Sequence, residues 1–345
     1  MDAKNESNDE IIFLKTGFEK SDYNISHNNF MASTLHCLIN INFLTNFITN
    51  FDTNSIKNDF FEKYKELLND LISLNNKNDN DNDNKKISLK TFEQFLFSKE
   101  EYKNENNHNP KFLINNMINE FNLYIFSEFK NSKIADNFYI TLQKVRKCSI
   151  CKNYSEDAKI EEKFLIFDFC KLYNDKKGDK KLDIYDCLKS YTNEDYEDVK
   201  LQCDFCKKET EHKIRIIFKS LPNILIFFVD YGNNNNLEFK GDFTFNDTIT
   251  FDEKLLPTIK NVEINYKNKE YYLSSLICVR EIMSKKEHYH TFCRENEHEN
   301  YYCYNGDMIN EVKNINNKIG KDIIQLNNKK ERLPYALIYI SNNKN

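Results

Sequence analysis

The sequence contains no tryptophan, and its 345 residues include only six glycines and four prolines. Collagen-like repeats and proline-rich linkers are therefore excluded, because both need these residues in large numbers. No run of 18 apolar residues occurs, so we expect no membrane-spanning helix. The first residues, MDAKNESNDEIIF, lack the basic start and apolar stretch of a signal peptide. We expect a protein of the cytoplasm, the nucleus or both, without membrane contact.

An excess of charge of one sign is also lacking. The 49 basic residues nearly balance the 54 acidic ones, which leaves a net charge of −5. Such a chain does not favour direct nucleic-acid binding, which needs a basic surface. Hydrophobic residues make up 40% and aromatic residues 14% of the sequence. This content supplies a sizeable core and excludes a wholly disordered chain.

The spacing of apolar residues differs between the two ends of the chain. Helical spacing predicts helices over 29–50, 56–74 and 110–129. Residues 75–86 contain no apolar residue and predict a solvated loop. Later segments are short, rich in Ile, Phe, Tyr and Val, and bounded by polar residues. They predict strands over 138–147, 163–169, 213–219, 224–230, 271–282, 289–294, 301–304 and 335–340.

Helices followed by strands indicate an α+β fold and not an alternating α/β fold. The stretch DYGNNNNLEF, which follows residue 229, predicts a hairpin turn between two strands.

Two CxxC pairs give the strongest local signal, and they consist of Cys148 with Cys151 and Cys203 with Cys206. Four thiolates are the ligand set of a tetrahedral structural zinc site. The 51 residues between the pairs are many for a compact zinc ribbon, so we expect each pair at a strand end. We predict one structural Zn²⁺ here, since cysteines inside the cell stay reduced. The other cysteines are expected to be small core residues: Cys37, Cys170, Cys187, Cys278, Cys293 and Cys303.

Several separated stretches resemble the ubiquitin-specific proteases. The first runs from CSICKNYS to KIRIIFKSLPNILIFFVDY and contains both CxxC pairs. The second has a His-Tyr step at His288 and an aromatic run that ends at Asn305, and YALIYI is similar to the last strand of the family. The fourth, NISHNNFMASTLHCL from Asn24, resembles the box that carries the nucleophile. A weaker match, NHNPKFL, covers residues 107–113.

The resemblance implies a papain-like cysteine-protease core in a single domain over 20–342, after a polar tail over 1–19. In that family a helical thumb would span about 20–130, β fingers with zinc about 138–220, and a β palm about 221–342. These bounds are what the resemblance implies for this chain.

The same resemblance assigns His288 as the catalytic histidine, Asn305 as its orienting partner and Asn24 as the oxyanion-hole residue. The nucleophile position holds Asn29 and not cysteine. A carboxamide has no ionisable proton near neutral pH, so it cannot form the thioester intermediate of a thiol protease. Asparagine is abundant, with 52 residues, so the joint spacing of these positions matters more than any one of them. Cys37 lies eight residues beyond Asn29, about 12 Å along a helix.

We therefore expect a catalytically inactive member that acts as a ubiquitin-binding or scaffold module. The box around Asn29 is similar to that of inactive splicing-type relatives, although these generally depart at the zinc pairs. Two alternatives remain: an active thiol-dependent deubiquitinase, and a zinc-stabilised interaction domain of an RNA-processing complex. The expected partners are ubiquitin or a ubiquitinated protein, within a protein complex.

Further departures from the family suggest that more than the nucleophile has changed. Lys286 and Glu287 stand where the family has glycines, and residues 107–109 differ from its Gln-Asp-Ala stretch. We therefore expect Asn29→Cys to remain inert.

Overall fold

The structure is a computed structural model that describes residues 13–19, 25–50, 59–76, 86–104, 108–128, 137–175, 181–192, 195–196, 200–231, 242–252, 269–281, 287–295, 300–305, 308–312 and 333–342. These residues form two compact units. The first comprises those within Met1–Lys130, Ser274–Ile315 and Lys329–Pro334, and the second those within Asn131–Leu273, Asn316–Asn328 and Tyr335–Asn345. Strands β14 (Lys269–Glu281) and β18 (Leu333–Ser341) contribute residues to both.

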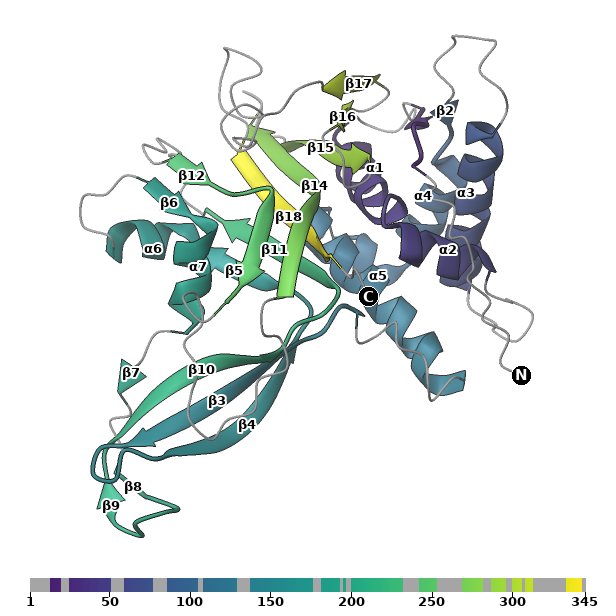
Figure 1. Cartoon of the computed structure of the whole chain (residues 1–345). Helices are drawn as coiled ribbons and strands as arrows, with labels where there is room; N and C mark the ends of the chain where they lie inside the picture. The colour runs from purple at the N-terminus through teal and green to yellow at the C-terminus, as the bar shows by residue number, and fades with distance from the viewer. Residues whose placement is uncertain are drawn as a thin grey trace, which may run out of the picture. The chain divides into compact units, whose positions relative to one another are not determined.

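The first unit contains the helices that the sequence predicts near the N-terminus (Figure 1). They are α1 (Ile25–Ile39), α2 (Asn42–Asn50), α3 (Asp59–Asn75), α4 (Lys90–Ser98) and α5 (Pro110–Glu128), with a 3-10 turn at Glu100–Tyr102. The helices predicted over 56–74 and 110–129 are confirmed, and α4 was not predicted. Most of the predicted loop over 75–86 lies outside the described residues. None of the described helices is long and apolar enough to cross a membrane.

The single helix predicted over 29–50 is wrong, because α1 ends at Ile39 and α2 begins at Asn42. Asn40 lies between them. Its Nδ2 donates to the carbonyl of His36 (3.0 Å), and its Oδ1 accepts from the backbone N–H of Leu14 (3.1 Å). A short polar side chain that bonds nearby backbone favours the end of a helix over its interior. The apolar residues on both sides hide this break in the sequence pattern.

Antiparallel strands complete the first unit. The later part of β14 pairs with β15 (Glu287–Glu295), which pairs with β16 (Asn300–Asn305), and β16 pairs with β17 (Met308–Val312). Two short strands, β1 (Gly17–Phe18) and β2 (Lys86–Ile87), pair in parallel. Helix α1 packs on β15, where the hydroxyl of Thr291 donates to the carbonyl of Ser33 (3.0 Å). The helix and the strand are therefore joined by a buried hydrogen bond as well as by apolar packing.

His36 of α1 is buried in an aromatic stack. Its ring lies 3.9 Å from that of Tyr304 and 4.5 Å from that of Phe18, measured between centroids. Neither ring nitrogen has a hydrogen-bond partner among the described residues. Burial lowers the pKa of His36 to about 3, because the charged imidazolium would lose its hydration. Tyr304 is fixed in turn by its hydroxyl, which donates to the carbonyl of Leu14 (2.9 Å).

This stack predicts a loss of stability in mild acid. The pKa of His36 is about 3 in the folded chain and near 6.5 when unfolded, so its contribution is complete above pH 6.5 and falls as the pH drops below it. The loss approaches about 1.4 kcal/mol per pH unit, or about 2 kcal/mol at pH 5. His36→Phe keeps an aromatic ring but cannot titrate. In urea unfolding, the variant's stability relative to the parent should rise below pH 6.5; a difference that is constant with pH would contradict this account.

The described residues of the second unit form strands of two larger sheets, two two-stranded sheets and two short helices. Its helices are α6 (Phe169–Asp175) and α7 (Ile184–Tyr191). Its strands are β3 (Ile140–Cys148), β4 (Tyr154–Glu162), β5 (Leu165–Asp168), β6 (Lys181–Asp183), β7 (Asp195–Tyr196), β8 (Leu201–Gln202), β9 (Glu209–Thr210), β10 (His212–Ser220), β11 (Ile224–Asp230), β12 (Asp242–Thr244) and β13 (Thr248–Phe251). The predicted strands all exist, with ends shifted by up to two residues. The mixture of helices and sheets confirms the predicted α+β class.

One sheet of this unit has the order β4-β3-β10-β7, and its three long strands run out to the β8–β9 pair (Figure 1). We call this sheet with its tip the fingers. In the other sheet, β11 pairs antiparallel with β18 and parallel with β5. The hairpin predicted after residue 229 is wrong, because β12 pairs in parallel with β6 and not with β11. The residues of the predicted turn itself, 232–240, lie outside the described residues.

Lys269 holds the turn that joins β10 to β11. Its Nζ donates to the carbonyls of Leu221 (3.0 Å) and Pro222 (2.9 Å) and to Oδ1 of Asn223 (3.2 Å). Partial burial lowers the pKa of Lys269. The hydroxyl of Tyr271 donates to the same Pro222 carbonyl. These bonds fix the base of the fingers to β14 within the second unit.

Candidate functional site

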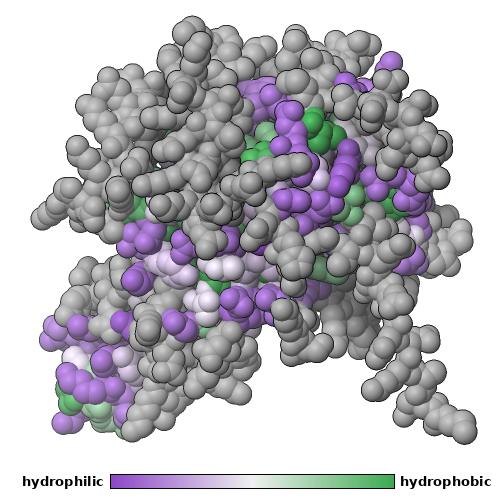
Figure 2. Space-filling model, turned by 45° about the horizontal axis from the view of Figure 1, so that its top comes forward, coloured by the Kyte–Doolittle hydropathy of each residue, from purple (hydrophilic) through white to green (hydrophobic). Residues whose placement is uncertain are grey.

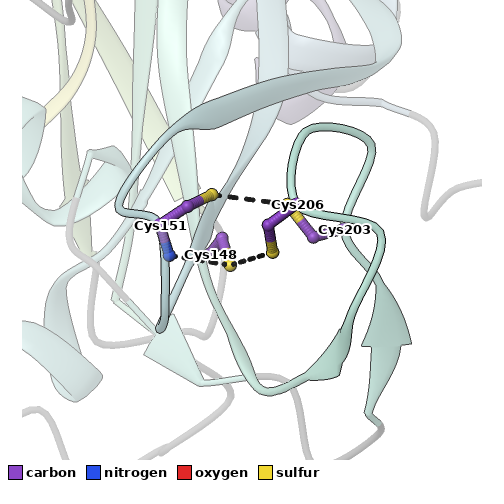
Figure 3. Close-up of side chains that lie close together, drawn as sticks. All are labelled: Cys148, Cys151, Cys203 and Cys206. Carbon is purple, nitrogen blue, oxygen red and sulfur yellow. Dashed lines mark hydrogen bonds between the residues drawn. The ribbon is translucent and has the colours of Figure 1, made fainter.

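The four paired cysteines converge at the tip of the fingers, although their pairs lie far apart in the sequence (Figure 3). The Sγ atoms of Cys148 and Cys206 are 3.9 Å apart, and those of Cys151 and Cys203 are 3.6 Å apart. All four sulfurs lie within 4.8 Å of one another. Four sulfurs about 2.3 Å from a tetrahedral zinc ion would be about 3.8 Å apart. The residues present therefore fit a zinc ion in identity, number and spacing.

The two pairs adopt the same turn. The backbone N–H of Lys152 donates to the carbonyl of Cys148 (3.1 Å), and that of Lys207 donates to the carbonyl of Cys203 (2.9 Å). Both lysines have a positive φ, 61° and 59°. A side chain with a Cβ is disfavoured in this left-handed region, so the turn stores some strain at each lysine. The signal in the sequence was the shared CxxCK pattern.

Lys207→Gly should stabilise the fingertip, because glycine adopts a positive φ without steric cost. We expect a gain of about 0.5–1 kcal/mol, after subtracting the greater freedom that glycine has in the unfolded chain. Lys208→Gly is the matched control, since it removes the adjacent lysine side chain at a position that has no positive φ. Urea unfolding of the two variants checks this expectation. Equal destabilisation by both would show that the turn carries no strain at Lys207.

The backbone around the sulfurs favours a thiolate at Cys203. Burial alone would raise its pKa, but hydrogen bonds from the backbone N–H groups of Cys206 and Phe205 and from the neighbouring thiols of Cys151 and Cys148 lower the pKa to about 6. At Cys151 the N–H of Asn153 favours the thiolate, yet burial and the neighbouring sulfurs raise the pKa to about 11. Four adjacent negative sulfurs repel one another unless a metal ion supplies the opposite charge.

In the first unit, the structure brings His288 and Asn305 together. Nε2 of His288 lies 2.9 Å from Oδ1 of Asn305. Because an amide oxygen can only accept, Nε2 carries the proton in this bond. The neutral ring then has its lone pair on Nδ1, the nitrogen that a general base uses to accept a proton. His290, two residues along β15, lies with its ring 4.5 Å from that of His288. This geometry is compatible with the predicted roles of His288 as a base and of Asn305 as its positioning partner.

The contacts between α1 and β15 fix their direction. Thr291 bonds to Ser33, and two residues further the thiol of Cys293 donates to the carbonyl of His36 (3.4 Å). The helix and the strand therefore run the same way along this contact. His288 is about 10 Å back from Thr291 along the strand, and Asn29 is about 6 Å back from Ser33 along the helix. The first turns of α1, with the backbone of Asn29, thus extend toward the His288 end of β15.

A third predicted segment also meets α1. The ring of His108, within the 107–109 stretch, stacks on Phe30, which follows Asn29, with centroids 5.7 Å apart and planes at 4°. Nε2 of His108 lies 2.8 Å from the carbonyl of Tyr102. The described part of the weak sequence match, 108–113, therefore lies beside the helix that carries the predicted nucleophile position.

The sequence model of the ubiquitin carboxyl-terminal hydrolase family matches residues 22–339. The chain belongs to this family. A search of curated proteins by sequence finds no match. The assignment to this family therefore depends on the residue pattern along 22–339 and not on similarity to one curated sequence.

Solved structures agree with this hydrolase family in fold. The SAGA DUB module of Ubp8, Sgf11, Sus1 and Sgf73, bound to monoubiquitin and carrying a cysteine-to-alanine change in Ubp8, matches with a TM-score of 0.67 and 16% identity. The same module bound to ubiquitin aldehyde gives the same values, and both matches cover 97% of this chain and 71% of that chain. A yeast SAGA DUB module with a Sgf73 tyrosine-to-alanine mutant gives 0.63 and 15%, over 97% and 70%. The papain-like fold is confirmed.

The remaining site residues of the hydrolase domain are described only in part. Asn24 lies outside the described residues, and so does the side chain of Asn29. The roles assigned to them, and to His288 and Asn305, remain predictions. The prediction of buried cysteines is confirmed for all five described ones outside the CxxC pairs, and the side chain of Cys170 lies outside the described residues. They are Cys37, Cys187, Cys278, Cys293 and Cys303.

Sequence reasoning missed the contacts that support the His288–Asn305 pair. Tyr304, next to Asn305, stacks on His36 and bonds to Leu14. Lys15 adds an ion pair with Glu295 of β15 (2.8 Å). Residues 13–18 precede the family match, so the resemblance gave no reason to place them here. They help to hold the ends of β15 and β16 in register.

Proposed function

We propose that this chain is a non-catalytic ubiquitin-specific-protease-like domain that binds ubiquitin or a ubiquitinated protein as a scaffold module. One sequence feature supports the proposal: the family resemblance assigns the nucleophile position to Asn29, on a helix whose first turns extend toward His288. The base and its partner remain, since His288 and Asn305 are hydrogen-bonded. A base without a nucleophile cannot start acyl transfer. The domain keeps the family's fold without the group that performs its chemistry.

The cysteines of the first unit do not favour replacement of that nucleophile. Cys37 is the nearest in sequence, and burial, followed by its bond with Cys293, raises the pKa of the Cys37 thiol well above its usual value. A reactive cysteine needs the opposite environment, with an accessible and stabilised thiolate. Cys278 lies opposite His290 in the sheet, but it is fully buried. An active deubiquitinase that uses one of these thiols is therefore disfavoured.

Ubiquitin is proposed as the partner by analogy with the solved neighbours. The module that contains Ubp8 is bound to monoubiquitin in one structure and to ubiquitin aldehyde in another. The shared fold, which covers 97% of this chain, supports the proposal of a ubiquitin-binding surface. We also propose that one structural Zn²⁺ binds the four thiolates of Cys148, Cys151, Cys203 and Cys206. A reducing compartment, the cytoplasm or nucleus, suits this thiol set.

Titration of isotope-labelled ubiquitin with the zinc-loaded protein tests the binding. We expect saturable chemical-shift changes in ubiquitin without any cleavage product. A ubiquitin that lacks its C-terminal tail serves as the control and separates tail binding from binding of the globular body. Unchanged ubiquitin spectra at saturating protein would refute ubiquitin binding and leave an interaction domain of another kind, such as one in an RNA-processing complex.

A further inference from the structure

The fingertip exposes apolar side chains that the fold does not require. In the described part of the chain, three large hydrophobic residues are exposed: Ile150 (52%), Phe205 (52%) and Ile160 (39%). Ile150 and Phe205 occupy the same position of the two CxxC turns, directly before the second cysteine. Figure 2 shows hydrophobic surface at the tip of the fingers, among hydrophilic residues. An apolar patch on an otherwise polar end is typical of a binding surface.

The turns direct these two side chains outward. The backbone N–H of Ile150 donates to Sγ of Cys148, and the N–H of Phe205 donates to Sγ of Cys203, both at 3.4 Å. Each backbone is therefore tied to the sulfur cluster, and the side chain cannot fold back over it. Anchors held in place before binding lose little conformational entropy when a partner arrives. An aromatic and an aliphatic side chain fixed in this way suit the centre of an interface.

The charge around the patch selects the partner. Lys152, Lys207 and Lys208 are exposed beside the two apolar residues. Apart from the cysteines, segments 147–153 and 203–209 together contain four lysines and two acidic residues, a net charge of +2. Four thiolates with one Zn²⁺ would add −2 at the centre of the tip, so its positive charge lies on the exposed lysines at the rim. Complementary charge at the rim steers a partner of opposite sign.

We propose that the fingertip, defined as Ile150, Phe205 and the three exposed lysines Lys152, Lys207 and Lys208, docks an acidic protein segment that carries apolar side chains. This inference goes beyond ubiquitin binding, because it assigns a second partner to a surface of the second unit. A single-stranded nucleic acid fits less well. Asp204 and Glu209 are exposed on the same loops and would repel phosphates, and one aromatic ring gives few stacking positions.

Fluorescence anisotropy with the full, zinc-loaded chain tests the proposal. The probe is a short fluorescein-labelled peptide that alternates glutamate with leucine or phenylalanine. We expect saturable binding that weakens about tenfold in the double variant Ile150→Ser with Phe205→Ser, and that weakens with salt. Peptides with lysine in place of glutamate, or serine in place of the apolar residues, should bind at least about tenfold more weakly.

Ile160→Ser is the matched control, since it removes the third exposed hydrophobic residue from β4, away from the CxxC turns. It should leave peptide affinity unchanged, and the zinc content of every variant should equal that of the parent. The proposal would be overturned by no peptide binding, by equal loss in Ile160→Ser, or by tighter binding of oligouridylate RNA. Unlabelled ubiquitin should not displace the peptide. Displacement would assign the fingertip to the ubiquitin site instead, while loss of ubiquitin binding alone would leave this proposal standing.

Discussion

Purified protein should leave ubiquitin conjugates intact, at a rate at least about 10⁴-fold below that expected of an active relative. The hydrogen-bonded His288 and Asn305 can hold and orient a proton, but they stabilise an intermediate only after a nucleophile has formed it. With asparagine at position 29, direct attack by water is the remaining route. Residual catalysis of that kind is far below that of a complete triad. The measurement is hydrolysis of a ubiquitin–fluorophore substrate over hours.

Two variants sharpen this expectation. His288→Ala should change nothing in the unmodified protein, whereas it would abolish a hidden activity that used this base. Asn29→Cys should also remain inert, because Lys286, Glu287 and residues 107–109 differ from the family pattern. Cleavage by Asn29→Cys that requires His288 would show that the nucleophile was the only part lost. In that case the His288–Asn305 geometry is competent as it stands.

Removal of the metal should disorder the fingers and spare the helices of the first unit. The fingers have a small apolar core of their own, in which Tyr154 packs against Val145 and Ile217. Each such side chain contributes about 1.5–3 kcal/mol on burial. Structural zinc binds with about 10–16 kcal/mol of apparent free energy, so the proposed Zn²⁺ would be the dominant stabilising contact at this tip. We expect loss of amide-exchange protection across β3, β4 and β10 after chelation, with α3 and α5 unchanged.

Cys203→Ser should reproduce the effect of chelation, because it removes one of four ligands. Cys187→Ala is the matched control, since it removes a buried thiol of the same unit that lies outside the cluster. The control should keep one zinc per chain and full protection in the fingers. Metal analysis of freshly purified, reduced parent protein that finds no zinc would refute the assignment of the site.

The elements that the sequence predicts well are those whose own residues decide their structure. Strand β11 was predicted with its observed bounds, because a run of Ile, Leu, Phe and Val is bounded by polar residues and is buried on both faces. The metal site at the CxxC pairs was predicted for a similar reason, because four cysteines at this spacing have few roles other than metal binding. The break at Asn40 was not predicted, because it depends on a bond to Leu14, 26 residues away.

Strand β4 shows where local pattern fails. Its sequence, YSEDAKIEE, has little apolar alternation and is mostly exposed, so no periodicity marks it as a strand. It forms because β3 supplies a complete antiparallel partner, and Arg146 pairs with Asp157 (3.0 Å) across the two strands. The His288–Asn305 pair was found only through family resemblance. The stack of His36 on Tyr304 supports that pair. It joins segments that are far apart in the sequence, so the spacing of residues within either segment does not predict it.

The most direct test of the central claim is incubation with a ubiquitin electrophile that forms a covalent bond with active-site cysteines. The unmodified protein should remain unlabelled, because Asn29 offers no thiolate and Cys37 is buried with a raised pKa. An active ubiquitin-specific protease in the same tube confirms that the reagent works, and mass spectrometry of the intact chain gives the readout. Addition of one ubiquitin to a cysteine of this chain, blocked by prior alkylation and lost in His288→Ala, would contradict a non-catalytic function.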